Sequence, residues 1–208
     1  MPKLTAIDVA ILPPADVSQR AIALSASLPA SEGQGLRLDA THLPHVTLMQ
    51  LFVRAEEIDV AMQQIDDVVR EHGPLRLRVS GGGHSRHTVW LTVDRTPALD
   101  ALHERLMEAL RGVERQGGTS AAFAGGDARP GDVIWVTTYR AKASFGSFTP
   151  HITLGHAKQP PRVEPFEFDA TTVAACQLGR FCTCRRVLRE WTLSGSAAAP
   201  PDSSHQPR

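Results

Sequence analysis

Apolar residues recur along this chain at two different spacings, and each spacing predicts a different element. In residues 75–80, Leu, Leu and Val alternate with Arg, Arg and Ser, a pattern that is typical of a half-buried strand. In residues 56–72, apolar residues recur every three or four positions, which predicts an amphipathic helix. Gly73 and Pro74 end that helix. The chain therefore combines helices with strands.

Further segments with these two patterns follow one another along the chain. We expect strands over residues 4–12, 45–53, 75–80, 88–94, 133–139, 151–155, 164–177 and 183–193. We expect helices over residues 15–28, 56–72 and 97–112. The glycine-rich residues 113–132 are expected to form a loop, and the triple glycine at 81–83 a turn or bulge.

One short sequence occurs twice in the chain. Residues 44–48 read Pro-His-Val-Thr-Leu, and residues 150–154 read Pro-His-Ile-Thr-Leu. In each half the His segment follows a strand, a helix and a loop, and the second half has the added strand at 133–139. Self-similarity of this kind indicates a repeated unit. We therefore expect two similar lobes, with one His strand of each facing the other across a shared cleft.

Each copy of the motif places an imidazole and a hydroxyl on one side of its strand. Side chains at i and i+2 share a face, so His45 projects with Thr47, and His151 with Thr153. One neutral imidazole can take a proton from the attacking water or hydroxyl, while the other, protonated, gives one to the leaving oxygen. The threonine hydroxyls can hydrogen-bond the phosphate oxygens. The pattern favours phosphodiester cleavage and requires no metal ion and no cofactor.

These paired motifs resemble the His-x-Thr/Ser-x motifs of the two-histidine phosphoesterase superfamily. That superfamily includes bacterial 2′-5′ RNA ligase-like proteins and cyclic-nucleotide phosphodiesterases, and the resemblance covers about residues 4–193. It implies an α+β, bilobal, duplicated fold in which two mainly antiparallel sheets line a central cleft, with helices on the outside. It also implies substrates with 2′,3′-cyclic phosphate, 2′-5′-linked or ADP-ribose cyclic phosphate ends. By this resemblance, the catalytic set is His45, Thr47, His151 and Thr153.

The resemblance leaves two classes of function open. An acid–base pair serves both directions of a reaction, so reverse 2′-5′ RNA ligase activity is expected beside hydrolysis. The other class is a non-catalytic nucleotide-binding module of the same fold, against which the intact His and Thr pairs argue. Neither pattern nor resemblance says which His is the acid. Tyr139 and Phe148 are predicted to bind substrate by stacking on a base, with ordinary core packing as the alternative.

The charge balance limits the partners of the chain. Lys and Arg together number 22, as do Asp and Glu, so the formal net charge is zero. Proteins that bind long nucleic acids through the phosphate backbone usually have more basic than acidic residues. We therefore expect a nucleotide or a short RNA end as substrate, and no long duplex. A cluster of Arg180, Arg185, Arg186 and Arg189 is either a solvated strand face or a lip that attracts phosphate.

Cysteine and zinc chemistry are the competing explanations for the site. Three cysteines, Cys176, Cys182 and Cys184, lie close together and are expected to be free thiols in a strand. None has a His-based context that indicates a nucleophile. A zinc site built on His45, His151 and a third ligand is a further alternative, but the threonines beside them are poor zinc ligands.

The remaining patterns concern the limits of the domain and its surroundings. We expect one bilobal domain over residues 1–194 and a disordered tail over residues 195–208, which is rich in Ser, Ala and Pro. No apolar run approaches 18 residues, and Met1 to Leu4 lead directly into the first strand pattern. We therefore expect a cytoplasmic protein that does not enter a membrane, and a monomer.

Overall fold

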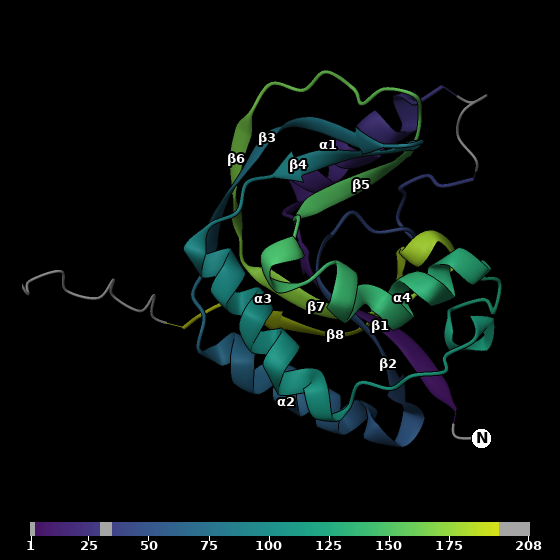
Figure 1. The fold of residues 1–208 in the computed structure, drawn as a ribbon. Helices are drawn as coiled ribbons and strands as arrows, with labels where there is room; N and C mark the ends of the chain where they lie inside the picture. The colour runs from purple at the N-terminus through teal and green to yellow at the C-terminus, as the bar shows by residue number, and fades with distance from the viewer. Residues whose placement is uncertain (1–2, 30–34, 196–208) are drawn as a thin grey trace, which may run out of the picture.

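Two four-stranded antiparallel sheets form the framework of the chain. The computed structural model describes residues 3–29 and 35–195. The strands are β1 (Leu4–Leu12), β2 (Val46–Arg54), β3 (Leu75–Ser85), β4 (Thr88–Val93), β5 (His151–His156), β6 (Phe166–Ala170), β7 (Thr172–Leu178) and β8 (Cys184–Thr192). The helices are α1 (Ala15–Ser27), α2 (Ile58–Arg70), α3 (Pro97–Ala109) and α4 (Pro130–Lys142). The strand order is β2-β1-β7-β8 in one sheet and β5-β4-β3-β6 in the other (Figure 1).

The arrangement confirms the predicted α+β fold with two antiparallel sheets. The alternation in β3 also has the predicted consequence, because Leu77 and Val79 are buried while Arg76 and Arg78 are exposed. None of the helices in residues 3–29 and 35–195 is long and apolar enough to span a membrane. The predicted tail lies outside the described residues from position 196 onward.

Residues 133–139, predicted as a strand, belong to helix α4, so that prediction is wrong. The run of Val, Ile and Thr favours a strand by propensity alone. However, Pro130 begins the helix, where its missing N–H is not needed. The Asp132 carboxylate accepts a hydrogen bond of 2.9 Å from the backbone N–H just before that proline. Val136 and Tyr139 are buried on the side that packs on β2, so capping and packing override the propensity.

Two further boundaries differ from the pattern-based expectation. The single strand predicted over residues 164–177 is two strands, because Thr171 separates β6 in one sheet from β7 in the other. The chain thus passes between the sheets at that residue. The triple glycine lies inside β3, where the pairing register with β4 shifts between Val79 and Gly81. The bulge is therefore at Ser80, directly before the three glycines and not within them, and Gly81 adopts a φ of 153° there.

In each half of the chain, a helix packs on the sheet that holds the His strand of the other half. Helix α1 follows β1 but packs on β5, and α3 follows β4 but packs on β2 (Figure 1). β2 begins directly after His45, and β5 begins at His151. Each is an edge strand of its sheet. Each His strand is therefore supported by a helix from the opposite half, and neither lobe is complete without the other.

The two His strands carry the same irregularity at the same place. In the pairing of β1 with β2, the register skips Leu48, because Val9 pairs with Met49 and Ala10 with Thr47. In the pairing of β4 with β5, the register skips Leu154 in the same way. A bulge leaves one residue without ladder hydrogen bonds. Both bulges follow the motif threonine directly, which shows that the repeat extends to backbone geometry.

At each bulge, the carbonyl of the skipped residue accepts a hydrogen bond from a helix side chain of the opposite half. Ser25 of α1 donates a hydrogen bond of 2.6 Å to the Leu154 carbonyl and accepts one of 2.9 Å from the backbone N–H of Leu38. His103 of α3 donates through Nδ1 to the Leu48 carbonyl at 2.6 Å. Its Nε2 accepts from the backbone N–H of Phe145 at 2.9 Å. Two different residue types thus perform the same task in the two halves.

Replacing Ser25 with alanine is expected to lower the free energy of unfolding by about 1–3 kcal/mol, because two buried backbone groups lose their partner. Urea unfolding followed by circular dichroism measures the change. Ser27→Ala, two residues along the same helix and exposed, is the matched control and should change stability little. Equal unfolding midpoints for the two variants would contradict the assigned role of Ser25.

Candidate active site

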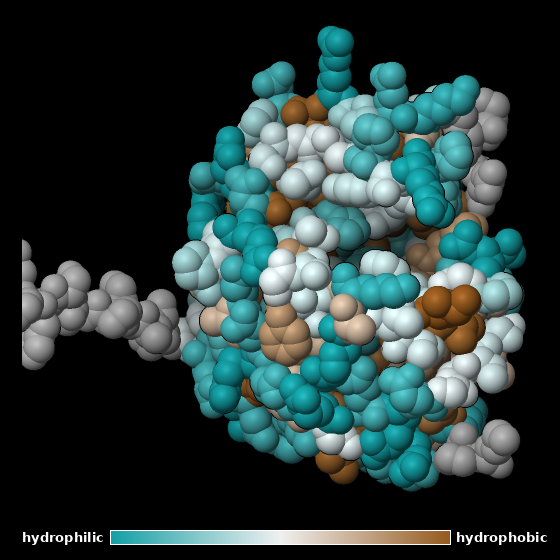
Figure 2. Space-filling view, in the orientation of Figure 1, coloured by the Kyte–Doolittle hydropathy of each residue, from teal (hydrophilic) through white to brown (hydrophobic). Residues whose placement is uncertain are grey.

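Both copies of the motif line one cleft between the two sheets. His45, Thr47, His151 and Thr153 all lie on its wall. The cleft has a volume of about 990 Å³, at the upper end of the range for ligand pockets. Figure 2 shows the recess on this side of the molecule, between the sheet that contains β5 and helix α4. The fold thus brings together the four residues that the sequence predicts as a catalytic set.

The two imidazoles are held in the same way. Nδ1 of His45 lies 2.8 Å from the Leu43 carbonyl, and Nδ1 of His151 lies 2.7 Å from the Thr149 carbonyl. A carbonyl only accepts hydrogen bonds, so Nδ1 carries the proton in both rings. Nε2 of each ring is then the nitrogen that can gain or lose a proton during a reaction.

The surroundings of the two imidazoles differ. Burial lowers the pKa of His151 most strongly, the Thr149 carbonyl raises it, and the positive charge of His45 lowers it further. The Trp90 ring lies beside the His151 ring, with 5.2 Å between ring centroids. The balance favours a neutral His151 at neutral pH, which is the form that accepts a proton.

Asp8, which the sequence patterns did not single out, lies directly behind the first motif. Its Oδ2 is 3.5 Å from Nε2 of His45 and accepts a hydrogen bond of 2.8 Å from the Thr47 hydroxyl. Gln50 donates a second hydrogen bond to the same oxygen at 2.7 Å. Burial raises the pKa of Asp8 to about 6, against the lowering effect of His45, Gln50 and Thr47. A carboxylate inside the apolar run of residues 4–12 was the signal available in the sequence.

Tyr139 and Phe148, the predicted substrate-binding residues, lie at the cleft wall but are almost fully buried. Tyr139 comes from α4, and its hydroxyl is 3.4 Å from the Leu48 carbonyl. Phe148 stacks on His103 with 4.0 Å between ring centroids. These contacts make both rings part of the support of the Leu48 bulge. Their role in substrate binding remains a prediction.

More open aromatic rings also line the cleft. Trp135 of α4 is 42% exposed, and Figure 2 shows hydrophobic surface over that helix beside the recess. Trp90 and Phe181 line the cleft as well and are half-buried. Exposed rings of this kind offer stacking surfaces for bases. Sequence patterns do not distinguish these three residues, because aromatic residues at strand and helix spacing resemble ordinary core positions.

Positive charge predominates in the cleft wall. Arg86, Arg95 and Arg129 line it, against one acidic side chain, Asp132. Arg129 is ion-paired with Asp132, and Arg95 with Asp100 outside the lining. An anionic substrate fits this wall, although the formal net charge of the chain is zero. The cluster of Arg180, Arg185, Arg186 and Arg189 does not contribute to this lining.

One group of possible metal ligands lies in the described part of the chain. Ligand atoms of Asp8, His45 and Cys184 lie within 4.8 Å of one another. Burial raises the pKa of the Cys184 thiol well above its usual range, and the thiolate is the form that binds zinc. Thr47 and Gln50 already occupy one oxygen of Asp8. The group therefore fits a metal ion poorly. Cys176 and Cys184 are free thiols in strands, as predicted, whereas Cys182 is a free thiol in the turn before β8.

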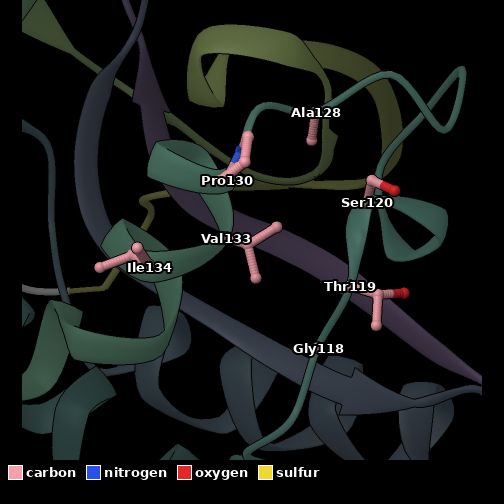
Figure 3. Close-up of a pocket in the computed structure, with 7 residues that line it drawn as sticks. All are labelled: Gly118, Thr119, Ser120, Ala128, Pro130, Val133 and Ile134. Atoms are coloured by element: carbon pink, nitrogen blue, oxygen red, sulfur yellow. The ribbon is translucent and has the colours of Figure 1, made fainter.

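A second cavity, of about 390 Å³, lies beside α4 and the segment that precedes it (Figure 3). Its lining residues are Gly118, Thr119, Ser120, Ala128, Pro130, Val133 and Ile134. None of these side chains titrates or ligates a metal. This cavity lacks the groups for acid–base catalysis, so the cleft is the candidate active site.

Comparison with known proteins shows the family and the fold of the chain. The family model for the 2′-5′ RNA ligase superfamily matches residues 13–186. No curated protein matches the chain significantly in sequence.

Solved structures with the same fold cover nearly the whole chain. Escherichia coli LigT in complex with 3′-AMP is 22% identical, with a TM-score of 0.63, over 92% of this chain and 99% of LigT. TT0787 of Thermus thermophilus is 21% identical, with a TM-score of 0.61, over 92% and 99% of the two chains. A structure described as a phosphoesterase is 20% identical, with a TM-score of 0.61, over 91% and 99%. At these identities, the structures show a shared fold.

Proposed function

The chain belongs to the 2′-5′ RNA ligase superfamily, and on this premise we propose that it is a metal-independent phosphodiesterase acting on 2′,3′-cyclic phosphate or 2′-5′-linked nucleotide or RNA ends. The observation that carries the proposal is the matched pair of imidazoles in one cleft, each held through Nδ1 by a carbonyl two residues earlier. Each leaves Nε2 for proton transfer.

The proposed chemistry divides the proton transfers between the two rings. One neutral imidazole takes the proton of a water molecule as its oxygen attacks phosphorus. The other, protonated, gives its proton to the ribose oxygen as the bond from phosphorus to that oxygen breaks. In the proposal, the Thr153 hydroxyl binds a non-bridging oxygen, whose charge grows in the transition state. The Thr47 hydroxyl does the same only after its proton turns away from Asp8, to which it donates in this structure. The net reaction adds one water molecule and opens the cyclic phosphate.

The nature of the cleft supports a nucleotide as substrate. Its arginines suit phosphate, and its open aromatic rings suit a base. LigT, which shares the fold, has been solved with 3′-AMP, ATP and NADP+. We therefore propose nucleotides and short RNA ends as the ligands of this cleft. The reverse reaction, which joins a 2′,3′-cyclic phosphate end to a hydroxyl end through a 2′-5′ linkage, uses the same acid–base pair.

Purified protein is expected to hydrolyse nucleoside 2′,3′-cyclic monophosphates in excess EDTA, because the proposed mechanism uses only side chains. The measurement is product formation from the four nucleosides by chromatography, which also shows which P–O bond breaks. The control is the double variant His45→Ala/His151→Ala, which should bind but not turn over.

Two outcomes would contradict the proposal. Loss of activity in EDTA that zinc restores indicates a metal site instead. Tight nucleotide binding without turnover, on the cyclic monophosphates and on 2′-5′-linked dinucleotides alike, indicates the non-catalytic binding module.

A further inference from the structure

Helix α4 lines the cleft in the second half of the chain, and the described residues between α1 and β2 hold no matching helix in the first half. Building on the proposed function, which places a nucleotide in this cleft, we propose that Trp135 of α4 binds the base of the substrate. The cleft then takes purine nucleotides in preference to pyrimidine nucleotides. Trp135 is thus a specificity-determining residue, separate from the groups that transfer protons.

One side of α4 is turned toward the cleft. Gly131, Trp135 and Tyr139 all line the cleft and follow one another at intervals of four residues, so they share one side of the helix. Ile134, the residue before Trp135, lines the second cavity instead (Figure 3). The two exposed apolar side chains of α4 therefore lie on different surfaces, and that of Trp135 belongs to the cleft.

The place of Trp135 along α4 suits the base of a nucleotide whose phosphate lies at the two imidazoles. The Tyr139 hydroxyl is 3.4 Å from the carbonyl of Leu48, the residue that follows Thr47 of the first motif. Trp135 lies one helical turn earlier than Tyr139, which is a rise of about 6 Å along the helix axis. The ribose of a nucleotide can span that step, so one ligand can reach both Trp135 and the first motif.

The two other open rings in the cleft wall already have close neighbours. The Trp90 ring lies beside the His151 ring, with 5.2 Å between ring centroids, and against Gly83, where any Cβ would meet the indole. The Arg129 guanidinium lies over the Phe181 ring, 4.0 Å from its centroid. Both rings are only half-buried, but these contacts leave less of each ring open to a base.

Trp135 keeps an open ring face. Its ring contacts that of Tyr139 edge to face, with 6.2 Å between centroids and 85° between the ring planes. The residue is 42% exposed, although the indole is largely apolar. Covering such a surface with a flat ring removes it from water, which is favourable. The indole therefore offers a stacking surface for a base at the wall of the cleft.

Stacking on an indole discriminates between bases by the size of their rings. A purine has two fused rings and a pyrimidine has one, so a purine covers more of the indole and removes more apolar surface from water. Stacking does not read the hydrogen-bonding edge of a base. We therefore expect adenosine and guanosine nucleotides to bind more tightly than cytidine and uridine nucleotides, with little difference within each pair.

The test compares Trp135→Ala with Ile134→Ala, the matched control at the exposed neighbour outside the cleft. Trp135→Ala should raise KM for adenosine 2′,3′-cyclic monophosphate about tenfold and change kcat little, because the base stack contributes to binding and not to proton transfer. The preference for purines should disappear. KM for ribose 2,3-cyclic phosphate, which has no base, should stay the same. Trp135→Phe should keep most of the affinity, and Ile134→Ala should match the wild type.

An equal rise in KM for the substrates with and without a base would show that Trp135 only supports the fold, and would overturn the proposal. So would an unchanged KM, or a purine preference that Trp135→Ala retains. Calorimetry with adenosine 2′-monophosphate and 3′-monophosphate measures the affinities without turnover. Equal affinities in the wild type and Trp135→Ala contradict base binding by Trp135 alone, whereas binding that depends on Trp135 without any turnover contradicts only the proposed reaction. No binding by the wild type contradicts both.

Discussion

Replacement of His45 or His151 by alanine is expected to lower kcat for 2′,3′-cyclic phosphate hydrolysis by at least ~10²-fold while the chain stays folded. In the proposed mechanism, each ring performs one of the two proton transfers. Both rings line the cleft, and neither belongs to the main hydrophobic core, so the chain is expected to stay folded without either of them. Single-turnover kinetics at saturating substrate measure the change.

The matched control for both variants is His87→Ala. His87 is exposed in the turn between β3 and β4 and does not line the cleft. This variant should retain wild-type kcat. A folded His45→Ala or His151→Ala protein with near-normal turnover would refute the two-imidazole mechanism, and circular dichroism establishes that each variant is folded.

Replacement of His103 by alanine is expected to have the largest effect on stability, about 3 kcal/mol, and to lower activity as well. The imidazole is fully buried, stacks on Phe148, and bridges the Leu48 carbonyl and the Phe145 N–H. Its loss creates a cavity and leaves buried backbone groups without a partner. Activity should fall because the Leu48 bulge directly follows Thr47 of the first motif. Urea unfolding and steady-state kinetics measure the two effects.

The same residue gives a pH test with a defined sign. Burial lowers the pKa of His103 below its ordinary value of 6.5, although the Leu48 carbonyl opposes this. As the pH falls through 6.5, the unfolded chain binds a proton that the folded chain excludes, so this residue reduces stability in acid. The free energy of unfolding of His103→Ala should therefore fall less steeply between pH 7 and pH 5 than that of the wild type. Parallel curves would show that His103 is not held neutral in the fold.

Much of the site follows from local sequence, because its geometry is local. The i and i+2 rule places His45 beside Thr47 and His151 beside Thr153, and both pairs line the cleft as predicted. The alternation of residues 75–80 and the three-and-four spacing of residues 56–72 likewise predict the correct elements. These patterns are reliable because burial of one face requires the period of the element that carries it.

Where the pattern failed, a helix cap or a contact with a distant strand was responsible. Residues 133–139 have strand propensity, but their packing against β2 and the Asp132 cap hold them as a helix. Residues 164–177 read as one strand, but their two parts pair with different sheets on either side of Thr171. Propensity describes a residue in isolation and does not include the tertiary contacts that bury it in the fold.

The two His-x-Thr motifs, their shared orientation and the mixed α+β character of the fold can all be read from the chain, since each depends on residues that are neighbours in sequence. Other features appear only in three dimensions: the two edge strands meet in one cleft, a helix from the other half supports each bulge, and Asp8 lies behind His45. These features join residues far apart in the sequence. They depend on the pairing of β1 with β2 and on the crossing of α1 and α3, which no local period encodes.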